Sequence, residues 1–348
     1  MKVEKSKKYK ENNSERGLLS DTYHNNFRRL YEKVLSNVVN TLFSNRISSQ
    51  SSPKEEALIN ELRKNTKGFN FKSNGFSSED EWMKHAKRVA NMIQIDDPRR
   101  FLTWNAIKDT MCVGNYMFIV KELKYLKSLP DWETRWKKVL LEDKIGQPTP
   151  FFLYPKSSGN IIHHAYVLAM FENMTKKKIK DLKFIFDFGA GYGSVCRLAY
   201  RLGFKGKYLM YDIPVFSQIQ TFYLENLGKK VLPFQKFLDS SDGICCLSEP
   251  KELLVFFKKN KIKPKDALLL GMWSISESPL KTRELVTPHL SSFSNYLFGY
   301  QDKFGEVDNN QYFEKVKNNL PKDISWKYKR LYQLPGHNFL CGTISGKK

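Results

Sequence analysis

The chain has 348 residues, of which 41% are hydrophobic and 14% aromatic, and its formal net charge at neutral pH is +22. This composition predicts a globular protein large enough for two domains, and its apolar runs are too short to cross a membrane. The positive charge favours an anionic partner, but the lysines are spread along the chain and no arginine-rich helix or zinc-finger pattern organises them.

The N-terminal segment, residues 1–20, is polar and rich in lysine, and it lacks the apolar stretch of a secretory signal. We therefore expect a flexible basic tail on a cytoplasmic protein. The five cysteines are odd in number and form no C-x-x-C pair, which argues against a disulfide framework and a zinc ribbon. No D-D or D-x-D cluster follows the expected strands, so no metal is predicted.

Residues 21–150 carry helical signals only. Helix starts are indicated by a polar cap beside a proline, or by capping-box spacing, at Ser52-Pro53, Ser78 with Glu81, and Asp97-Pro98. The loop GQPTPFFLYPKSSG at 146–159 then interrupts this pattern with prolines and glycines. We place a domain boundary there, between a helical region at 21–150 and a second domain at 151–348.

Beyond residue 182, short apolar runs alternate with amphipathic ones. Strands are expected at 184–188, 207–213, 230–234, 267–273 and 295–300, and helices at 194–203, 215–227, 249–260, 279–290 and 309–319. Such alternation predicts right-handed βαβ units on a parallel sheet. Two more strands flank the Pro335-Gly336 turn. The expected fold is therefore α/β: a Rossmann-like, doubly wound, seven-stranded sheet with a terminal antiparallel hairpin, preceded by an all-helical region.

The turn after the first of these strands reads DFGAGYG and has the pattern D-x-G-x-G-x-G. Three glycines allow a tight turn and a close ligand, and the next helix offers its N-terminal amides. Enzymes that bind dinucleotides need the third glycine at position 194, where Ser194 stands, so the spacing disfavours NAD and FAD. A turn without any nucleotide, in which the nearby acids only cap helices, is the alternative.

DFGAGYG, with the acidic Asp212 ending the second strand in YLMYDIP, resembles the cofactor site of class I S-adenosylmethionine-dependent methyltransferases. The resemblance implies S-adenosylmethionine as cofactor. In that family an acid at the position of Asp187 supports the methionine part, and one at the position of Asp212 hydrogen-bonds the ribose hydroxyls. The implied cofactor residues are Asp187, Gly189, Ala190, Gly191, Gly193, Asp212 and Ile213.

Four further segments, SSGNIIHHAY, YDIP, SISESPL and FGEVDNNQYF, resemble the sugar O-methyltransferases found near glycan-assembly genes. This narrower resemblance implies methyl transfer to a sugar hydroxyl of a glycan, nucleotide-sugar or glycolipid. The helical region resembles no family, and we expect it to act as a lid that shapes the acceptor site. Two alternatives stay open. One is an RNA or cap methyltransferase that uses the basic charge, with nucleic acid as the less favoured partner. The other is a binding protein that keeps the fold without catalysis.

Methylation of a hydroxyl requires a base that takes its proton. His163 and His164 are neighbours on an expected helix and point about 100° apart, so helical geometry does not choose between them. Glu277 follows the fourth expected strand, at the sheet edge where ligands bind, although a place in the first turn of a helix explains it equally well. Candidate acceptor contacts, each of which also suits a helix cap or a turn, are Ser276, Tyr300, Asp302, Asn309 and His337.

Overall fold

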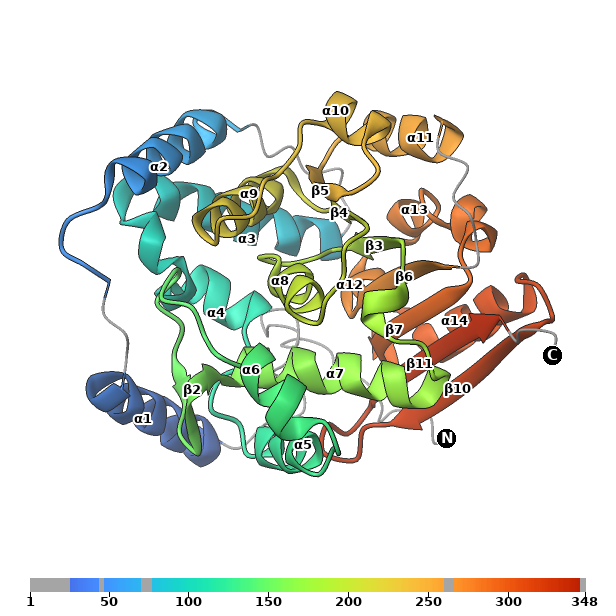
Figure 1. Cartoon of the computed structure of the whole chain (residues 1–348), viewed down its shortest axis with the longest axis horizontal. Coiled ribbons are helices and arrows are strands. Elements are labelled where there is room, and N and C mark those ends of the chain that lie inside the picture. The colour runs from blue at the N-terminus through green and yellow to red at the C-terminus, as the bar shows by residue number, and fades with distance from the viewer. Residues whose placement is uncertain (1–25, 44–46, 70–76, 260–265, 345–348) are drawn as a thin grey trace, which may run out of the picture.

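The computed structural model describes residues 26–43, 47–69, 77–259 and 266–344. The expected basic tail lies outside these ranges. A seven-stranded sheet forms the centre of the molecule (Figure 1). Its strands are β3 (Phe184–Phe188), β4 (Lys207–Tyr211), β5 (Gly243–Leu247), β6 (Ala267–Met272), β7 (Asn295–Gln301), β10 (Ile324–Arg330) and β11 (His337–Ile344).

The strand order is β10-β11-β7-β6-β3-β4-β5. Strand β11 runs antiparallel to both of its neighbours, and the other neighbouring pairs are parallel. Helices accompany this sheet: α7 (Gly159–Thr175), α8 (Ser194–Arg201), α9 (Pro214–Asn226), α10 (Phe234–Asp239), α11 (Pro250–Lys259), α12 (Ser274–Glu277), α13 (Leu280–Arg283) and α14 (Asn309–Asn318). The predicted doubly wound sheet with a terminal hairpin is confirmed.

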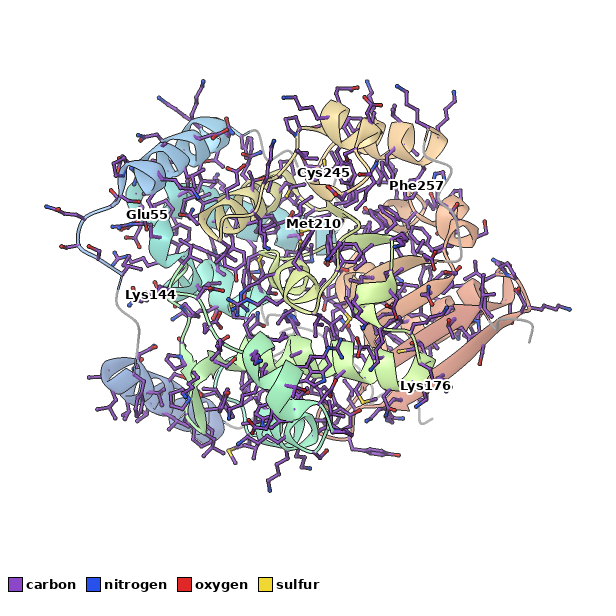
Figure 2. The ribbon with its side chains drawn as sticks, in the orientation of Figure 1. Glu55, Lys144, Lys176, Met210, Cys245 and Phe257 are labelled. Atoms are coloured by element: carbon purple, nitrogen blue, oxygen red, sulfur yellow. The ribbon has the colours of Figure 1, made fainter. Side chains whose placement is uncertain are left out.

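Successive side chains of each strand point to opposite faces of the sheet, and this produces two apolar layers, one on each face. Phe184 and Phe186 of β3 belong to one buried cluster, whereas Ile185 between them belongs to the other. Figure 2 shows side chains filling the space around the sheet, with Met210 inside and exposed lysines such as Lys176 at the periphery. Both faces must be covered because each carries large aromatic and aliphatic side chains.

Two predicted elements were wrong. Residues 230–234 form no strand: Val231 makes a single bridge to Ile244, and Pro233 is the cap residue in front of α10. The strand that fills this place in the sheet is β5, whose residues Cys245 and Cys246 pair with β4. The helix expected at 279–290 is only the short α13 and a 3₁₀ turn at Thr287–Ser292, because Pro288 cannot continue an α-helix.

The first part of the chain is helical, as predicted. It contains α1 (Asn26–Phe43), α2 (Pro53–Thr66), α3 (Ser77–Ile95), α4 (Asn105–Met111), α5 (Phe118–Lys127) and α6 (Lys137–Val139). Ser52 and Glu55 form a complete capping box at the start of α2, and Asp97 caps a 3₁₀ turn, whereas Ser78 lies inside α3. The expected loop at 146–159 contains a small hairpin, β1 (Pro150–Phe151) and β2 (Tyr154–Ser158).

The helical part packs directly on the sheet part. One buried apolar cluster runs from Ile59 of α2 through Leu123 of α5 to residues of α7, α8 and the sheet. The ring of Trp82 in α3 lies 6.1 Å from that of Phe216 in α9. The domain boundary near residue 150 stays a prediction, since the apolar core is continuous across it. Among the described helices, none has the length and apolar character needed to span a membrane.

Candidate functional site

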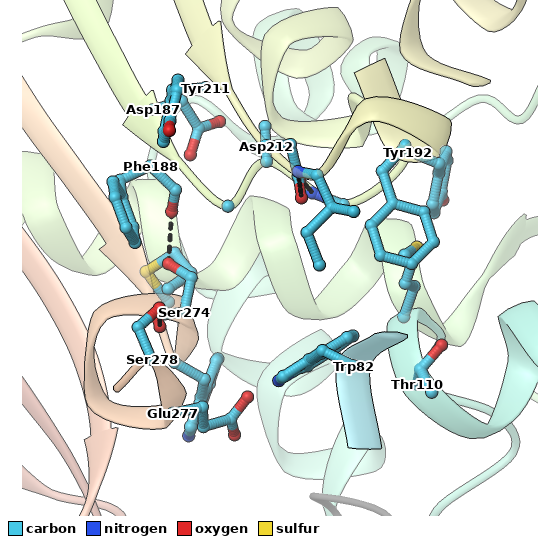
Figure 3. A pocket seen from close by; sticks show the side chains of 18 of the residues that line it. Trp82, Thr110, Asp187, Phe188, Tyr192, Tyr211, Asp212, Ser274, Glu277 and Ser278 are labelled. Carbon is cyan, nitrogen blue, oxygen red and sulfur yellow. Dashed lines mark hydrogen bonds between the residues drawn. The ribbon is translucent and has the colours of Figure 1, made fainter. Parts of the chain in front are cut away.

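A cavity of about 510 Å³ lies at the carboxyl ends of β3, β4 and β6 (Figure 3). Its volume is within the range of about 300–1,000 Å³ that is typical of small-molecule sites. Asp187 and Asp212 line it from the sheet, and Trp82 of α3 and Thr110 of α4 line it from the helical part. The helical region therefore forms part of the wall, at the sheet edge where open α/β proteins bind ligands.

The glycine turn borders this cavity, and its three glycines have positive φ angles of 68°, 59° and 90° at positions 189, 191 and 193. A Cβ at Gly189 would lie 2.2 Å from the Cβ of Ser274, whose hydroxyl donates to the carbonyl of Phe188, the dashed line in Figure 3. A Cβ at Gly191 would meet only the sulfur of Met111, at 4.0 Å. Gly189 is thus required by packing, whereas Gly191 leaves the cavity open to a ligand.

Replacing Gly189 by alanine is expected to lower the free energy of unfolding by about 3–4 kcal/mol, since overpacking against Ser274 adds to the cost of a positive φ. The matched control is Gly228→Ala, where φ is 72° and no atom lies within 4 Å of the added carbon. That control should cost only about 1–2 kcal/mol. Denaturant unfolding measures both, and equal losses would contradict the packing role of Gly189.

Asp212 holds the glycine turn together. One of its carboxyl oxygens accepts from the amide of Gly191 at 3.0 Å and from the side chain of Gln220 at 3.0 Å, and the other accepts from the amide of Ile213 at 2.8 Å. Gln220 also donates to the carbonyl of Gly191 at 2.9 Å. Desolvation raises the pKa of Asp212 to about 7. Gln220 was not predicted, because nothing in the sequence of α9 marks it as a partner of Asp212.

Asp187 is the buried acid at the end of β3. Its carboxyl accepts from the hydroxyl of Tyr208 at 2.7 Å. Burial raises the pKa of Asp187 to about 7, against the lowering effect of the Tyr208 hydrogen bond. The expected cofactor residues Gly189, Ala190, Gly191 and Ile213 also line the cavity, whereas Gly193 lies just behind them at the start of α8.

His163 of α7 lines the same cavity and is 2% exposed. Its Nδ1 lies 3.1 and 3.0 Å from the two carboxyl oxygens of Glu122, a fully buried residue of α5. A nitrogen facing two carboxyl oxygens is the one that donates, so Nε2 is left as the acceptor. The ring centroids of Phe118 and Trp273 lie 5.9 and 5.3 Å from that of His163 and fix its plane. Sequence reasoning missed Glu122, which is 41 residues away.

His164 also borders the cavity but is engaged differently. Its Nδ1 lies 2.8 Å from the hydroxyl of Ser194, the first residue of α8. Burial lowers the pKa of His164 to about 3, so the ring is neutral at physiological pH. The two adjacent histidines thus differ in environment: His163 is paired with a buried carboxyl group, and His164 joins α7 to the helix that follows the glycine turn.

Trp273, directly after β6, is a non-glycine residue with a φ of 62°. Its amide donates to the carbonyl of Gly299 at 2.7 Å, and its indole nitrogen donates to Nδ1 of His337 at 2.7 Å. Burial lowers the pKa of His337 to about 4, which keeps this nitrogen unprotonated. Sparsely populated backbone conformations concentrate at functional sites. Here the hydrogen bond from the Trp273 indole to His337 of strand β11 supports such a conformation at the wall of the cavity.

The remaining candidates divide into two groups. Glu277 lines the cavity. Five expected acceptor contacts do not belong to its lining: Ser276, Tyr300, Asp302, Asn309 and His337. Ser276 and Asn309 are fully buried, and Asn309 accepts from Arg283 at 3.0 Å, so both serve internal hydrogen bonds. Within the described ranges, no group of three or more metal-binding side chains comes together.

Comparisons with known proteins give distant likenesses only. No family model matches the chain, and no curated protein matches it. The 16S rRNA methylase ArmA is 14% identical over 53% of this chain and 86% of its own, with a TM-score of 0.34. The methyltransferase domain of bacterial CtHen1 is 10% identical over 52% and 97%, with a TM-score of 0.36. TrmK of M. capricolum, solved with S-adenosylhomocysteine, is 20% identical over 50% and 67%, with a TM-score of 0.30. These similarities are too distant to show a family or an activity for this chain.

Proposed function

We propose that this protein is an S-adenosylmethionine-dependent O-methyltransferase whose acceptor is a sugar hydroxyl. The observation that carries the proposal is the convergence of three features on one cavity: the glycine turn, the carboxyl groups of Asp187 and Asp212, and the imidazole ring of His163. A cofactor turn, two acids beside it and an oriented base are the parts that such a transfer requires.

The residues present fit the cofactor. Gly191 leaves the cavity open where a side chain would intrude, and the carboxyl group of Asp212 suits a pair of vicinal hydroxyls. The ionised form of Asp187 suits a cationic ligand. When bound, S-adenosylmethionine supplies a methyl group on a positively charged sulfur, which an oxygen nucleophile attacks.

His163 is the proposed general base. Its Nε2 takes the proton of the acceptor hydroxyl, while Glu122 keeps the hydrogen on Nδ1 and stabilises the positive charge that the ring gains. The aromatic neighbours Phe118 and Trp273 hold the ring in place and keep water away from it. The base thus comes from α7 and its orienting carboxyl group from the helical region.

The small number of cationic side chains in the cavity lining supports an acceptor without phosphate groups. Among the described residues, its lining contains one lysine, the exposed Lys281, and no arginine. A site for several phosphates is expected to present more cationic side chains than this.

An RNA or cap acceptor is the second candidate, and the net charge of +22 favours it. It predicts that RNA binding falls by roughly 10³–10⁵-fold between 50 and 200 mM salt if about six to ten phosphates are contacted. Methyl transfer to neutral methyl glycosides that persists in 200 mM salt would favour the sugar acceptor. Binding without any transfer would instead indicate a methyltransferase fold that has lost catalysis.

Isothermal titration with S-adenosylhomocysteine, with NAD as the control ligand, tests the cofactor. Micromolar binding of S-adenosylhomocysteine alone is expected, because the third glycine stands at position 193 and Ser194 occupies the place that a dinucleotide site reserves for it. Failure of the purified chain to bind S-adenosylhomocysteine would count against the proposed function.

Affinity for S-adenosylmethionine is expected to fall as the pH is lowered through 7. Asp187 and Asp212 each have a pKa raised to about 7, so both become protonated below that pH, and a cationic ligand favours the ionised form. If one proton must leave on binding, the dissociation constant rises about tenfold per pH unit on the acid side and levels off above pH 8. Titrations from pH 5.5 to 8.5 measure this, and a flat profile would contradict it.

A further inference from the structure

We propose that Glu277 binds the acceptor as a neutral carboxylic acid, donating its O–H to an oxygen of an uncharged sugar ring that lies against the indole of Trp82. This inference rests on the proposed function and deepens it, because it assigns the side chain that selects the acceptor and separates that side chain from the base.

The carboxyl group of Glu277 is held in a fixed orientation. The side chain is 4% exposed, and its Oε1 accepts from the amide nitrogen of Gln301 at 3.2 Å. The amide oxygen of Gln301 lies 3.0 Å from the hydroxyl of Ser276, whose single hydrogen also faces the carbonyl of Trp273 at 2.6 Å, so Ser276 donates to only one of these two oxygens at a time. In the described part of the chain, no hydrogen bond reaches Oε2 of Glu277.

The nearby guanidinium group of Arg283 does not pair with Glu277. Its three hydrogen bonds go to the carbonyl of Ser278 at 2.9 Å, to the carbonyl of Ser276 at 2.7 Å and to the side chain of Asn309 at 3.0 Å. Burial raises the pKa of Glu277 well above its usual range, and the hydrogen bond from Gln301 and the charge of Arg283 offset only part of this. The carboxyl group is therefore buried without a paired cation, an environment that favours its neutral form.

The proton has one suitable position. Because Oε1 already accepts from Gln301, the hydrogen belongs on Oε2, which becomes a donor. Glu277 lines the cavity, and in Figure 3 its carboxyl group points to the side where Trp82 lies. A protonated acid is a poor general base, so this chemistry suits recognition rather than proton abstraction.

Trp82 supplies the complementary surface. It reaches the cavity from α3, and the edge-to-face contact of its ring with Phe216 supports it from behind. A flat indole beside one neutral hydrogen-bond donor fits a ring with an apolar C–H face and oxygen atoms at its edge. Beside the indole of Trp82 and a neutral Glu277, a charged ring would lose hydration without a paired charge at that wall, and the lysine in the described cavity lining, Lys281, is exposed to solvent.

Infrared spectroscopy of the full chain tests the protonation of Glu277 without an acceptor. At pH 7 in D₂O, the carbonyl stretch of a protonated carboxyl group should be present in the wild type and reduced in Glu277→Gln. The matched control Glu284→Gln, an exposed residue next to α13, should leave the band unchanged. An unchanged band in Glu277→Gln would show that Glu277 is ionised and would overturn the inference.

Kinetics with neutral methyl glycosides as acceptors test recognition. Glu277→Ala is expected to raise KM about tenfold or more, because it removes a buried hydrogen bond to the acceptor. Glu277→Gln keeps a donor, so its KM should rise about threefold and should not change between pH 7 and 9. Loss of kcat at constant KM in Glu277→Gln would make Glu277 a base and overturn the inference.

The two proposals fail in different ways. If the wild type does not bind S-adenosylhomocysteine, the proposed function fails, while the infrared band still reports on Glu277. If cofactor binding is intact and methyl uronates are methylated with a lower KM than neutral methyl glycosides, the acceptor site selects a charged ring and the inference is overturned.

Discussion

Replacement of Asp212 by alanine is expected to weaken binding of S-adenosylhomocysteine about 100-fold. The change removes the carboxyl group proposed to accept from the ribose hydroxyls, and hydrogen bonds to charged groups contribute about 1.5–3 kcal/mol each. It also removes the acceptor of the Gly191 amide, so the glycine turn loses a contact that holds it at the edge of the cavity. Isothermal titration of the wild type and the variant measures the ratio of dissociation constants.

The matched control is Asp242→Ala, at an exposed acid beside the opposite end of β5. It removes the same charge at a distance from the cavity and should leave affinity unchanged. Asp212→Asn keeps the shape of the side chain and separates loss of charge from collapse of the turn, provided that thermal unfolding shows both variants to be folded. Wild-type affinity in folded Asp212→Ala would rule out the ribose role.

The sheet was predictable because its signals are local. Runs such as FIFDF and ALLLGM are buried on both faces, and the Pro335-Gly336 turn separates the two strands of the hairpin. The strand expected at 230–234 failed because KVLPF is as apolar as a true strand, whereas Pro233 ends its pairing. The correct strand, GICCL, is short and contains two cysteines, which carry less strand preference than valine or isoleucine.

Only part of the candidate site could be predicted from the sequence. The residues proposed to hold the cofactor lie within a short stretch of sequence around DFGAGYG and Asp212, and the resemblance of this stretch to methyltransferase cofactor sites indicated them. The residues proposed to meet the acceptor or to orient the base come from α3, α5, α7 and the end of β6. Nothing in the sequence near Glu122 or Trp82 distinguishes them from ordinary helix residues, because only tertiary packing brings them to the cavity.

This assembly changes the role expected of the helical region. Its role as a lid stays a prediction, and Trp82 of α3 is part of the cavity wall. The same region also supplies Glu122, which contacts the proposed base rather than the ligand. Arg135 in this region pairs with the buried Glu172 of α7 at 2.5 Å and helps to fix the helix that carries His163. We therefore propose that the helical part positions the base in addition to lining the cavity.

Replacement of His163 by asparagine is expected to lower kcat by about 10²–10⁴-fold, the usual contribution of a general base, while KM for the acceptor changes little. Asparagine offers an N–H group to Glu122, so the buried carboxyl group keeps a partner, but it has no basic nitrogen. The measurement is release of S-adenosylhomocysteine with a saturating neutral methyl glycoside. His289→Asn is the control, because His289 lies in the 3₁₀ turn before β7, at the opposite edge of the sheet.

Glu122 is a positioning residue, and Glu122→Gln distinguishes orientation from mere packing. Glutamine keeps the volume but not the negative charge that faces Nδ1 of His163, so kcat should fall, by less than in His163→Asn, while KM for the acceptor stays the same. Added imidazole should restore part of the turnover of His163→Ala, because the base is then supplied from solution. Full turnover in His163→Asn, with the cofactor still bound, would transfer the role of base to another group in the cavity.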